Sequence, residues 1–182
     1  MQAFTAFWNQ AMSLAVLGGG AAVLVLAYAL LMADTDIGRS ALAFVRKYIL
    51  GIGFVVSLSA VVSSLVYSEI IGFPPCLFCW YARVFFYPQV VLFGIALWRR
   101  DRSILPYALA LSAIGLAIST FHYLIESFQY SPIPCAAGGV SCLTRYVYEY
   151  GFITIPLMGL VGFAVMVVAL LAARRGSAQP HA

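Results

Sequence analysis

The sequence predicts an all-α integral membrane protein: a four-helix transmembrane bundle with one extra N-terminal transmembrane helix. Hydrophobic residues make up 64% of the 182 residues and charged residues only 9%, against about 25% in a soluble domain. Lipid satisfies no backbone hydrogen bonds, so only helices or closed barrels span a membrane. The apolar residues form long runs without strict alternation, which indicates helices.

Five apolar runs are long enough to cross a membrane. Each is near the ~20 residues that span ~30 Å of hydrocarbon. The first is expected to be a retained helix and not a signal peptide, because no Lys or Arg precedes it and the run is too long for a typical signal. The runs are roughly Ala11–Met32, Tyr48–Ile71, Trp80–Trp98, Ile104–Leu124 and Gly151–Ala172.

The spans divide the chain into three parts. Residues 1–47 are expected to hold the first helix and a basic cytoplasmic loop, residues 48–172 a four-helix catalytic bundle, and residues 173–182 a disordered cytoplasmic tail. Lys and Arg collect on the cytoplasmic side of membrane proteins, so the net charge of +4 indicates orientation and not nucleic-acid binding. Eight of the ten basic residues fall in three segments that five spans place on one side: Arg39, Arg46, Lys47, Arg99, Arg100, Arg102, Arg174 and Arg175.

The four cysteines form two close pairs, Cys76/Cys79 and Cys135/Cys142. Both pairs fall on the side opposite the basic segments, which is expected to be extracytoplasmic. Extracytoplasmic compartments permit disulfides. The two pairs are therefore expected to exchange disulfides or to hold them.

The segment GFPPCLFCWYAR, residues 72–83, places Cys79 at the expected start of the third span. Free N–H groups at a helix start favour an anion, so Cys79 is a candidate thiolate. Arg83 lies one turn further on the same face and needs an anionic or polar partner inside a membrane. The Cys79 thiolate, or an oxygen-bearing ligand beside it, would serve. The alternatives are an Arg83 that reaches the headgroups beside an inert disulfide, and a zinc site built from both pairs.

The second pair lies in SPIPCAAGGVSC, residues 131–142, where prolines stiffen the approach to Cys135 and small residues follow it. An exposed loop of this kind suits attack by a partner's thiol and transfer toward the first pair. A fixed disulfide that caps the loop is the alternative.

Other residues on this side admit more than one interpretation. His122 and Glu126, four residues apart, would form a proton relay, a metal pair or an ordinary hydrogen bond. The role of Glu69, just before the Cys-x-x-Cys turn, is equally ambiguous. Six aromatic residues are expected at the membrane interface, and the tyrosines among them would alternatively line an access path for an amphiphilic ligand: Trp8, Trp80, Trp98, Tyr146, Tyr148 and Tyr150.

Oxidation of thiols in this protein would require an electron acceptor. The sequence has no C-x-x-C-H haem motif, no dinucleotide fingerprint and no histidine cluster for copper. A membrane-soluble quinone remains by elimination. Arg83 supports it, because a guanidinium can stabilise negative charge on a quinone oxygen.

At these residues the sequence resembles the DsbB/BdbC family of disulfide-forming membrane oxidoreductases. The resemblance rests on PCLFCWYAR (residues 75–83), on the loop pair Cys135/Cys142 and on YGFITIPLMGL (residues 150–160). It implies a thiol:quinone oxidoreductase of the bacterial inner membrane. Such an enzyme reoxidises a DsbA-like thioredoxin-fold partner and uses ubiquinone or menaquinone. The first span departs from the usual four-helix layout of the family.

The resemblance also implies a role for each cysteine. Cys135 would form the mixed disulfide with the partner, and Cys142 would pair with Cys135 and relay toward Cys76. Cys79 would stand beside the quinone as a thiolate, with Arg83 assisting. Which cysteine of the loop pair is attacked first stays open.

Three rival functions share some of these features. A vitamin K epoxide reductase-like enzyme is also helical and quinone-linked, but its loop pair precedes the membrane pair. A transporter that carries electrons outward needs cysteines reachable from both sides of the membrane. A non-catalytic scaffold would use the cysteines as structural disulfides or zinc ligands.

Overall fold

The computed structural model describes residues 1–132 and 140–175. Five helices in these residues are long and apolar enough to cross a membrane, which confirms the predicted fold class. One π-helical turn, η1 (Val66–Ile70), continues the second helix. Cys135 and the predicted tail after Arg175 lie outside the described residues. The helices are α1 (Gln2–Leu31), α2 (Asp36–Leu65), α3 (Leu77–Arg99), α4 (Leu105–Phe128) and α5 (Ile155–Arg175).

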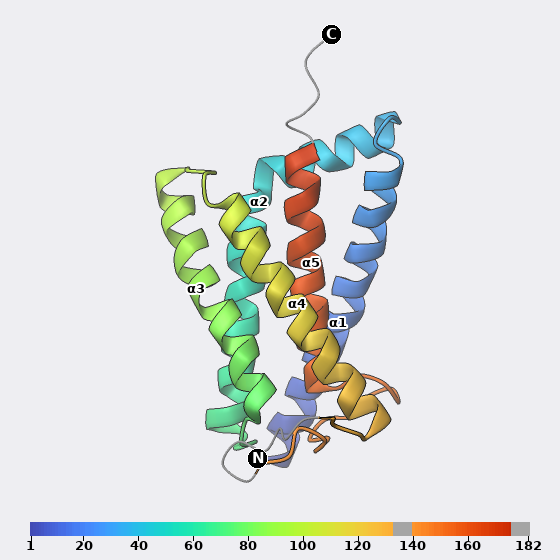
Figure 1. Ribbon diagram of the computed structural model, residues 1–182, viewed down its shortest axis with the longest axis vertical. Helices are drawn as coiled ribbons and strands as arrows, with labels where there is room; N and C mark the ends of the chain where they lie inside the picture. Colours follow the sequence, from blue (N-terminus) through green and yellow to red (C-terminus); the bar gives the residue numbers. More distant parts are fainter. Residues whose placement is uncertain (133–139, 176–182) are drawn as a thin grey trace.

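The predicted arrangement of four helices plus one is also present. Helices α2, α3, α4 and α5 form a ring in which each helix contacts the next and α5 contacts α2. Helix α1 lies outside this ring, along α5 and α2 (Figure 1). The extra helix therefore covers the seam between the first and last helices of the bundle.

Helix α2 begins well before the expected Tyr48, because Thr35 caps its N-terminus with a hydrogen bond from the Gly38 N–H. Its 30 residues extend ~45 Å, which is longer than the ~30 Å of hydrocarbon. Figure 1 shows that the first part of α2 runs across the end of the bundle before the helix turns into it. Arg39 and Arg46, expected in a loop, lie on this helix instead.

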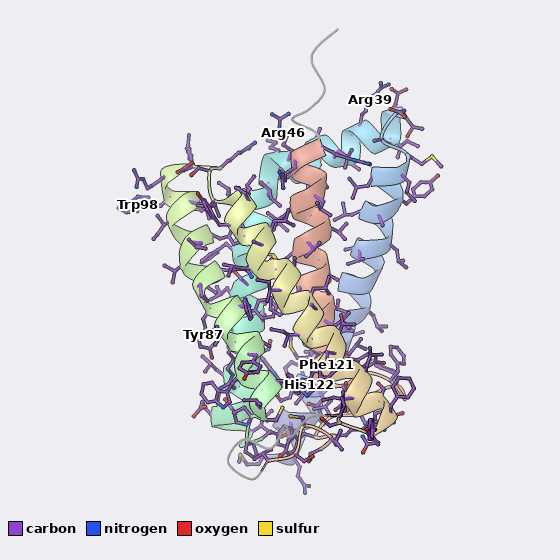
Figure 2. The ribbon with its side chains drawn as sticks, in the orientation of Figure 1. Arg39, Arg46, Tyr87, Trp98, Phe121 and His122 are labelled. Carbon is purple, nitrogen blue, oxygen red and sulfur yellow. The ribbon has the colours of Figure 1, made fainter. Side chains whose placement is uncertain are left out.

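The two ends of the bundle differ in chemistry. Figure 2 places Arg39, Arg46 and Trp98 at one end and His122 toward the other. Trp98 is almost fully exposed there, as expected for a residue at the membrane interface. Arg39 and Arg46 thus lie at the end of the bundle opposite His122.

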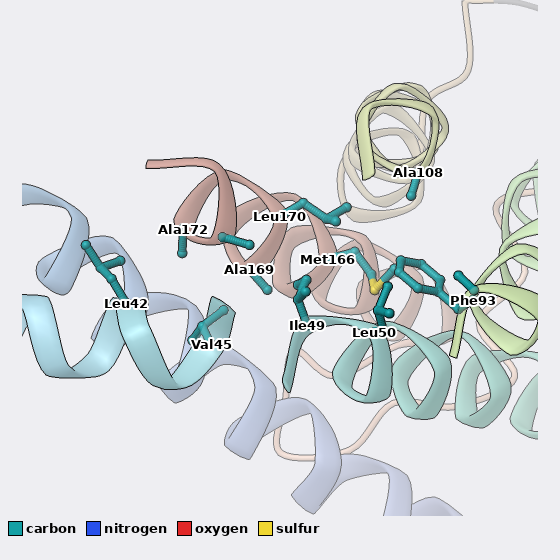
Figure 3. Packing of buried hydrophobic residues seen from close by; sticks show 12 residues of the cluster. Leu42, Val45, Ile49, Leu50, Phe93, Ala108, Met166, Ala169, Leu170 and Ala172 are labelled. Carbon is teal, nitrogen blue, oxygen red and sulfur yellow. The ribbon is translucent and has the colours of Figure 1, made fainter. Parts of the chain in front are cut away.

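The apolar core fills the basic half of the bundle, where α2, α3 and α5 meet. Ile49 and Leu50 of α2 pack there with Phe93 of α3 and with Met166 and Leu170 of α5 (Figure 3). This core fixes the ring of helices and leaves the other half of the bundle free to hold a cavity.

Close helix packing depends on glycine at Gly115 of α4, which faces the ring of Phe163 on α5. A Cβ at Gly115 would overlap that ring. We therefore expect Gly115→Ala to lower the free energy of unfolding by about 1–3 kcal/mol, the range for an overpacked core. Gly51→Ala is the matched control, because a Cβ there meets no atom within 4 Å. Unfolding in detergent tests this, and equal effects of the two changes would contradict it.

Candidate active site

The chain enters α3 through a sharp turn that places the first cysteine pair. Gly72 has a φ of 87°, a left-handed conformation that favours glycine. The Phe73 N–H then hydrogen-bonds back to the Tyr67 carbonyl at 2.9 Å. Two prolines follow, and the extended Cys76 is the N-cap of α3. Cys79 consequently lies in the first helical turn, as the sequence predicts.

Cys76 and Cys79 form a close dithiol. Their sulfur atoms lie 3.3 Å apart, with the Cys76 thiol donating toward the Cys79 sulfur. The Cys76 backbone N–H also hydrogen-bonds to that sulfur. Cys76 is buried, whereas Cys79 is partly exposed. These two donors and the free N–H groups of the first turn suit a negative charge on Cys79.

The environment of Cys76 keeps its proton in place. Its hydrogen bond to the Cys79 sulfur is the main cause that raises the pKa of the Cys76 thiol to about 12, and burial adds to this effect. The His122 ring acts in the opposite direction, with Nε2 3.6 Å from the Cys76 sulfur. Cys76 is therefore a poor nucleophile at neutral pH until a base takes its proton.

This raised pKa predicts how the reduced protein reacts with iodoacetamide. Only the thiolate is alkylated, so Cys76 is expected to stay largely unmodified at pH 8 and to gain reactivity only as the pH approaches its pKa of about 12. His122→Ala removes a contact that lowers this pKa, so it should slow the modification of Cys76 further. Mass spectrometry of the labelled peptides measures both rates. Alkylation of Cys76 at pH 8 as fast as an exposed thiol would contradict the prediction.

His122 and Glu126 take different positions on α4. His122 is buried against Cys76 and stacks at a tilt on Phe78, with ring centroids 5.4 Å apart. Glu126 is also buried, and its Oε2 has no hydrogen-bond partner among the described residues. The described side chains show no hydrogen bond between His122 and Glu126. The ordinary-bond interpretation is therefore not supported, and each residue is available to handle protons.

Arg83 remains inside the bundle and does not reach the headgroups. Its side chain is 6% exposed. Nε donates to Ser64 Oγ at 2.8 Å, and Nη2 donates to the Ser64 carbonyl at 3.0 Å and to Ser68 Oγ at 2.8 Å. The guanidinium also lies over the Trp80 ring, 4.9 Å from its centroid. No carboxylate of the described residues forms an ion pair with this guanidinium.

A cavity of about 440 Å³ connects these groups. This volume lies within the ~300–1,000 Å³ typical of small-molecule sites. Small and apolar residues of α1, α2 and α5 line most of the cavity. Besides serines, a threonine and tyrosines, the lining includes side chains with charge or redox chemistry: Cys76, Cys79, Arg83, His122, Glu126 and Cys142. A molecule in this cavity would contact the dithiol and the buried cation together.

The remaining candidate residues differ in their relation to the cavity. Tyr146 lines it and stacks on Phe73, with centroids 4.8 Å apart, which supports the access-path interpretation for this tyrosine. Tyr148 instead lies under Arg145 at the surface. Glu69 accepts a hydrogen bond from Ser68 at 2.8 Å and so touches Arg83 indirectly.

The second cysteine pair is only partly described. Cys142 is buried and belongs to the apolar cluster that contains Cys76, Phe78 and Ile125. Its predicted partner, Cys135, lies outside the described residues. The observed position of Cys142 brings one member of the loop pair to the first pair.

Three neighbouring side chains could also hold a metal ion. Cys76, Cys79 and His122 each offer a ligand atom, and these atoms lie within 4.8 Å of one another. Cysteine and histidine are the usual zinc ligands, but a structural zinc site has four of them. The zinc alternative thus draws on His122, which the sequence analysis considered as a metal ligand only together with Glu126. Metal analysis together with thiol titration separates this alternative from a free dithiol.

Sequence reasoning missed several residues of this site. It did not predict that Ser64 and Ser68 hold Arg83, although their four-residue spacing in an apolar span placed two hydroxyls on one helix face. It also missed the contact between His122 and Cys76 and the contribution of α1 to the cavity. No local sequence signal reveals these two contacts, because they depend on how distant helices pack.

A dithiol at the end of a transmembrane bundle, opening into an apolar cavity, places the protein in the class of membrane oxidoreductases that act on thiols. The chain belongs to the DsbB family: residues 46–175 match the family model described as disulfide bond formation protein DsbB. The resemblance found in the sequence is thereby confirmed. The matched region runs from Arg46 in α2 to the end of α5 and leaves out α1.

Named relatives agree with this assignment. The chain is 37% identical over 129 residues to a probable disulfide formation protein C 2 of Bacillus anthracis, covering 71% of this chain and 92% of the relative. It is 40% identical over 116 residues to disulfide bond formation protein C of Bacillus subtilis (strain 168), covering 63% and 84%. An SPbeta prophage-derived disulfide bond formation protein B of the same strain is 42% identical over 113 residues, covering 62% and 76%. No solved structure matches the chain significantly.

Proposed function

We propose that this protein is a thiol:quinone oxidoreductase of the bacterial inner membrane. It reoxidises an extracytoplasmic, DsbA-like thioredoxin-fold protein and so supports disulfide bond formation. The observation that carries the proposal is a cavity lined by both Cys79 and a buried Arg83 that has no carboxylate ion pair among the described residues. Membership of the DsbB family favours this function over that of a vitamin K epoxide reductase-like enzyme.

The proposed electron path is a chain of disulfide exchanges. A partner thiolate attacks the Cys135–Cys142 disulfide at Cys135, and the second partner thiol then displaces Cys135, which leaves the partner oxidised and the loop pair reduced. The loop pair next reduces the Cys76–Cys79 disulfide through a bond between Cys142 and Cys76. Each exchange makes one S–S bond and breaks one. Two electrons and two protons therefore move from the partner to Cys76/Cys79.

The cavity suits a quinone as the final acceptor. Its volume and apolar lining fit a ring with a hydrocarbon tail, and the buried Arg83 would hold a ring oxygen. Glu126 Oε2, which is buried and has no partner among the described residues, offers a second polar contact. A bound quinone would take up two electrons and two protons and leave as quinol. Ubiquinone and menaquinone both meet these requirements.

The chain's own residues would handle charge and protons. Cys79, beside the helix N-terminus, holds negative charge while Cys76 keeps its proton. His122 Nε2 is near enough to the Cys76 sulfur to accept this proton when the disulfide re-forms. Arg83 steadies the charge that develops at the acceptor. Ser64 and Ser68 fix the direction of the guanidinium.

The same proposal assigns the parts of the chain. Residues 48–172 would form the catalytic bundle and residues 1–47 would add a helix and a basic segment, while residues 173–175 belong to the last turn of α5. The basic end of the bundle faces the cytoplasm, and both cysteine pairs face outward. This orientation is supported by the separation of Arg39 and Arg46 from His122 (Figure 2).

The test is quinone reduction by the detergent-purified protein, driven by a reduced DsbA-like protein and followed by quinone absorbance. We expect turnover that needs both proteins, with one quinol formed for each partner disulfide. Folded protein that reduces neither ubiquinone nor menaquinone would contradict the proposal. Stoichiometric zinc would then favour the scaffold, and cysteines that react from the cytoplasmic side would favour the transporter.

A further inference from the structure

We propose that α1, which lies outside the family match, forms one wall of the acceptor site and binds the hydrocarbon tail of the quinone. The inference deepens the proposed function and rests on it. The 129 aligned residues are 92% of the B. anthracis relative, which leaves about 11 residues there, too few for another span. The wall that α1 supplies would therefore be a property of this chain that the relative lacks.

Helix α1 reaches the cavity with one face. Met12, Ala15, Gly19 and Ala22 all line it, and their spacing of three or four residues puts them on one side of a helix. The other sides of α1 carry large exposed side chains such as Leu24, which suit contact with lipid. Apart from Met12 and Val16, the residues of α1 on the cavity side are alanine or glycine, so they leave space beside the helix.

The part of the cavity next to α1 is apolar and continuous with the reactive end. The lining also includes Val56 of α2 and Val161 and Val165 of α5, and the last two lie beside Gly19 of α1. Cys79 and Arg83 line the same cavity at its polar part. A quinone ring would be held at the polar part, and its branched hydrocarbon tail is the part that matches the valine and glycine walls. An apolar tail is thus the occupant that the chemistry of this region selects.

Hydrogen bonds hold α1 against the bundle near both of its ends. Asn9 accepts a hydrogen bond from the Tyr67 hydroxyl of η1 at 3.1 Å and donates to Glu149 at 3.5 Å. At the other end Arg175 Nη1 of α5 donates to the Leu30 carbonyl at 2.7 Å. In between, a Cβ on Gly19 would lie 2.8 Å from Val161, so the helices touch there. The helix is therefore a fixed wall of the cavity and not a loosely attached anchor.

Two glycines of α1 provide a matched test. A Cβ at Gly18 or at Gly20 meets no atom within 4 Å, so a side chain can leave the backbone at either position without a clash at its first carbon. Gly18 lines the cavity and Gly20 does not. Gly18→Leu should therefore fill tail space, whereas Gly20→Leu should add apolar surface elsewhere. Ala22→Leu and Ala21→Leu form a second pair with the same difference, in case Gly18→Leu does not fold.

The experiment measures binding as well as turnover. A quinone with a photoreactive group on its isoprenoid tail is bound to the wild-type protein and irradiated, and labelled fragments are mapped by mass spectrometry. We expect labelling between Met12 and Ala22, with Gly18→Leu reducing it and Gly20→Leu leaving it unchanged. The ratio of KM for a quinone with several isoprene units to KM for a tail-less quinone should rise roughly 10-fold or more in Gly18→Leu, as for a poorly fitting methylene group.

Two kinds of failure are distinguishable. If the wild type turns over but α1 is not labelled, or the two glycine variants show the same KM ratio, the role of α1 is wrong and the proposed function stands. If the wild type neither binds nor reduces a quinone, the proposed function fails and the role of α1 fails with it.

Discussion

Replacing Cys79 with serine is expected to lower quinone reduction by the reduced partner roughly 10³-fold or more, as for the loss of an essential nucleophile. A serine hydroxyl cannot form a disulfide with Cys76, and it carries no negative charge at neutral pH. The geometry makes Cys79 the sulfur concerned, since it receives both hydrogen bonds from Cys76 and lines the cavity with Arg83. Quinone absorbance at saturating partner concentration measures the effect.

The control for this variant is Cys142→Ser, assayed with two reductants. With the thioredoxin-fold partner it should also be inactive, because the loop pair is interrupted. Dithiothreitol can reduce the Cys76–Cys79 disulfide directly, so with this reductant Cys142→Ser should reduce quinone while Cys79→Ser should not. Equal activity of the two variants with dithiothreitol would contradict the proposed order of the pairs.

Arg83→Gln is expected to lower kcat/KM for the quinone by about 10²–10³-fold, the usual cost of losing one donor that stabilises developing charge. Glutamine can still hydrogen-bond to Ser64 but supplies no positive charge to the cavity. The change should leave exchange between the partner and the loop pair unaffected, because that step occurs at Cys135 and Cys142. Stopped-flow measurement of partner oxidation, beside steady-state quinone reduction, separates the two steps.

Arg83→Lys is the matched control for charge. Lysine keeps the positive charge but cannot reproduce the forked contacts to Ser64 and Ser68, so an intermediate loss is expected. Ser68→Ala keeps the guanidinium and removes one of its contacts. Its decrease in kcat/KM should be smaller than that of Arg83→Lys. Wild-type kcat/KM in Arg83→Gln would show that the buried charge is not part of acceptor reduction.

The sequence was most informative about the fold. The number of spans was predictable because the length and apolarity of a run decide whether it crosses a membrane. The start of α2 was not predictable from apolarity. Its first turns lie at the end of the bundle, where a helix tolerates charged residues. The position of Cys79 in the first turn of α3 was predictable because the apolar run of the third span begins directly after it.

The site was predictable only where its residues are neighbours in the chain. Cys79 and Arg83 share one helix, so helical spacing placed both beside one ligand. The contact between His122 and Cys76 joins residues 46 positions apart and depends on the packing of α4 on α3. The role of α1 in the cavity was hidden for another reason: nearly every side of a membrane helix is apolar, so composition does not reveal which side faces a neighbour.

The placement of His122 at the end opposite Arg39 and Arg46 has a consequence for cell energetics (Figure 2). Under the proposed reaction, thiols release two protons at this end, and the acceptor can take up two protons from the same side. No net charge then crosses the hydrocarbon layer, where each elementary charge moved would couple the reaction to about 2.3 kcal/mol per 100 mV. Turnover would be electroneutral: collapsing the membrane voltage with an ionophore would not change its rate, and only the quinone pool's redox balance would drive it.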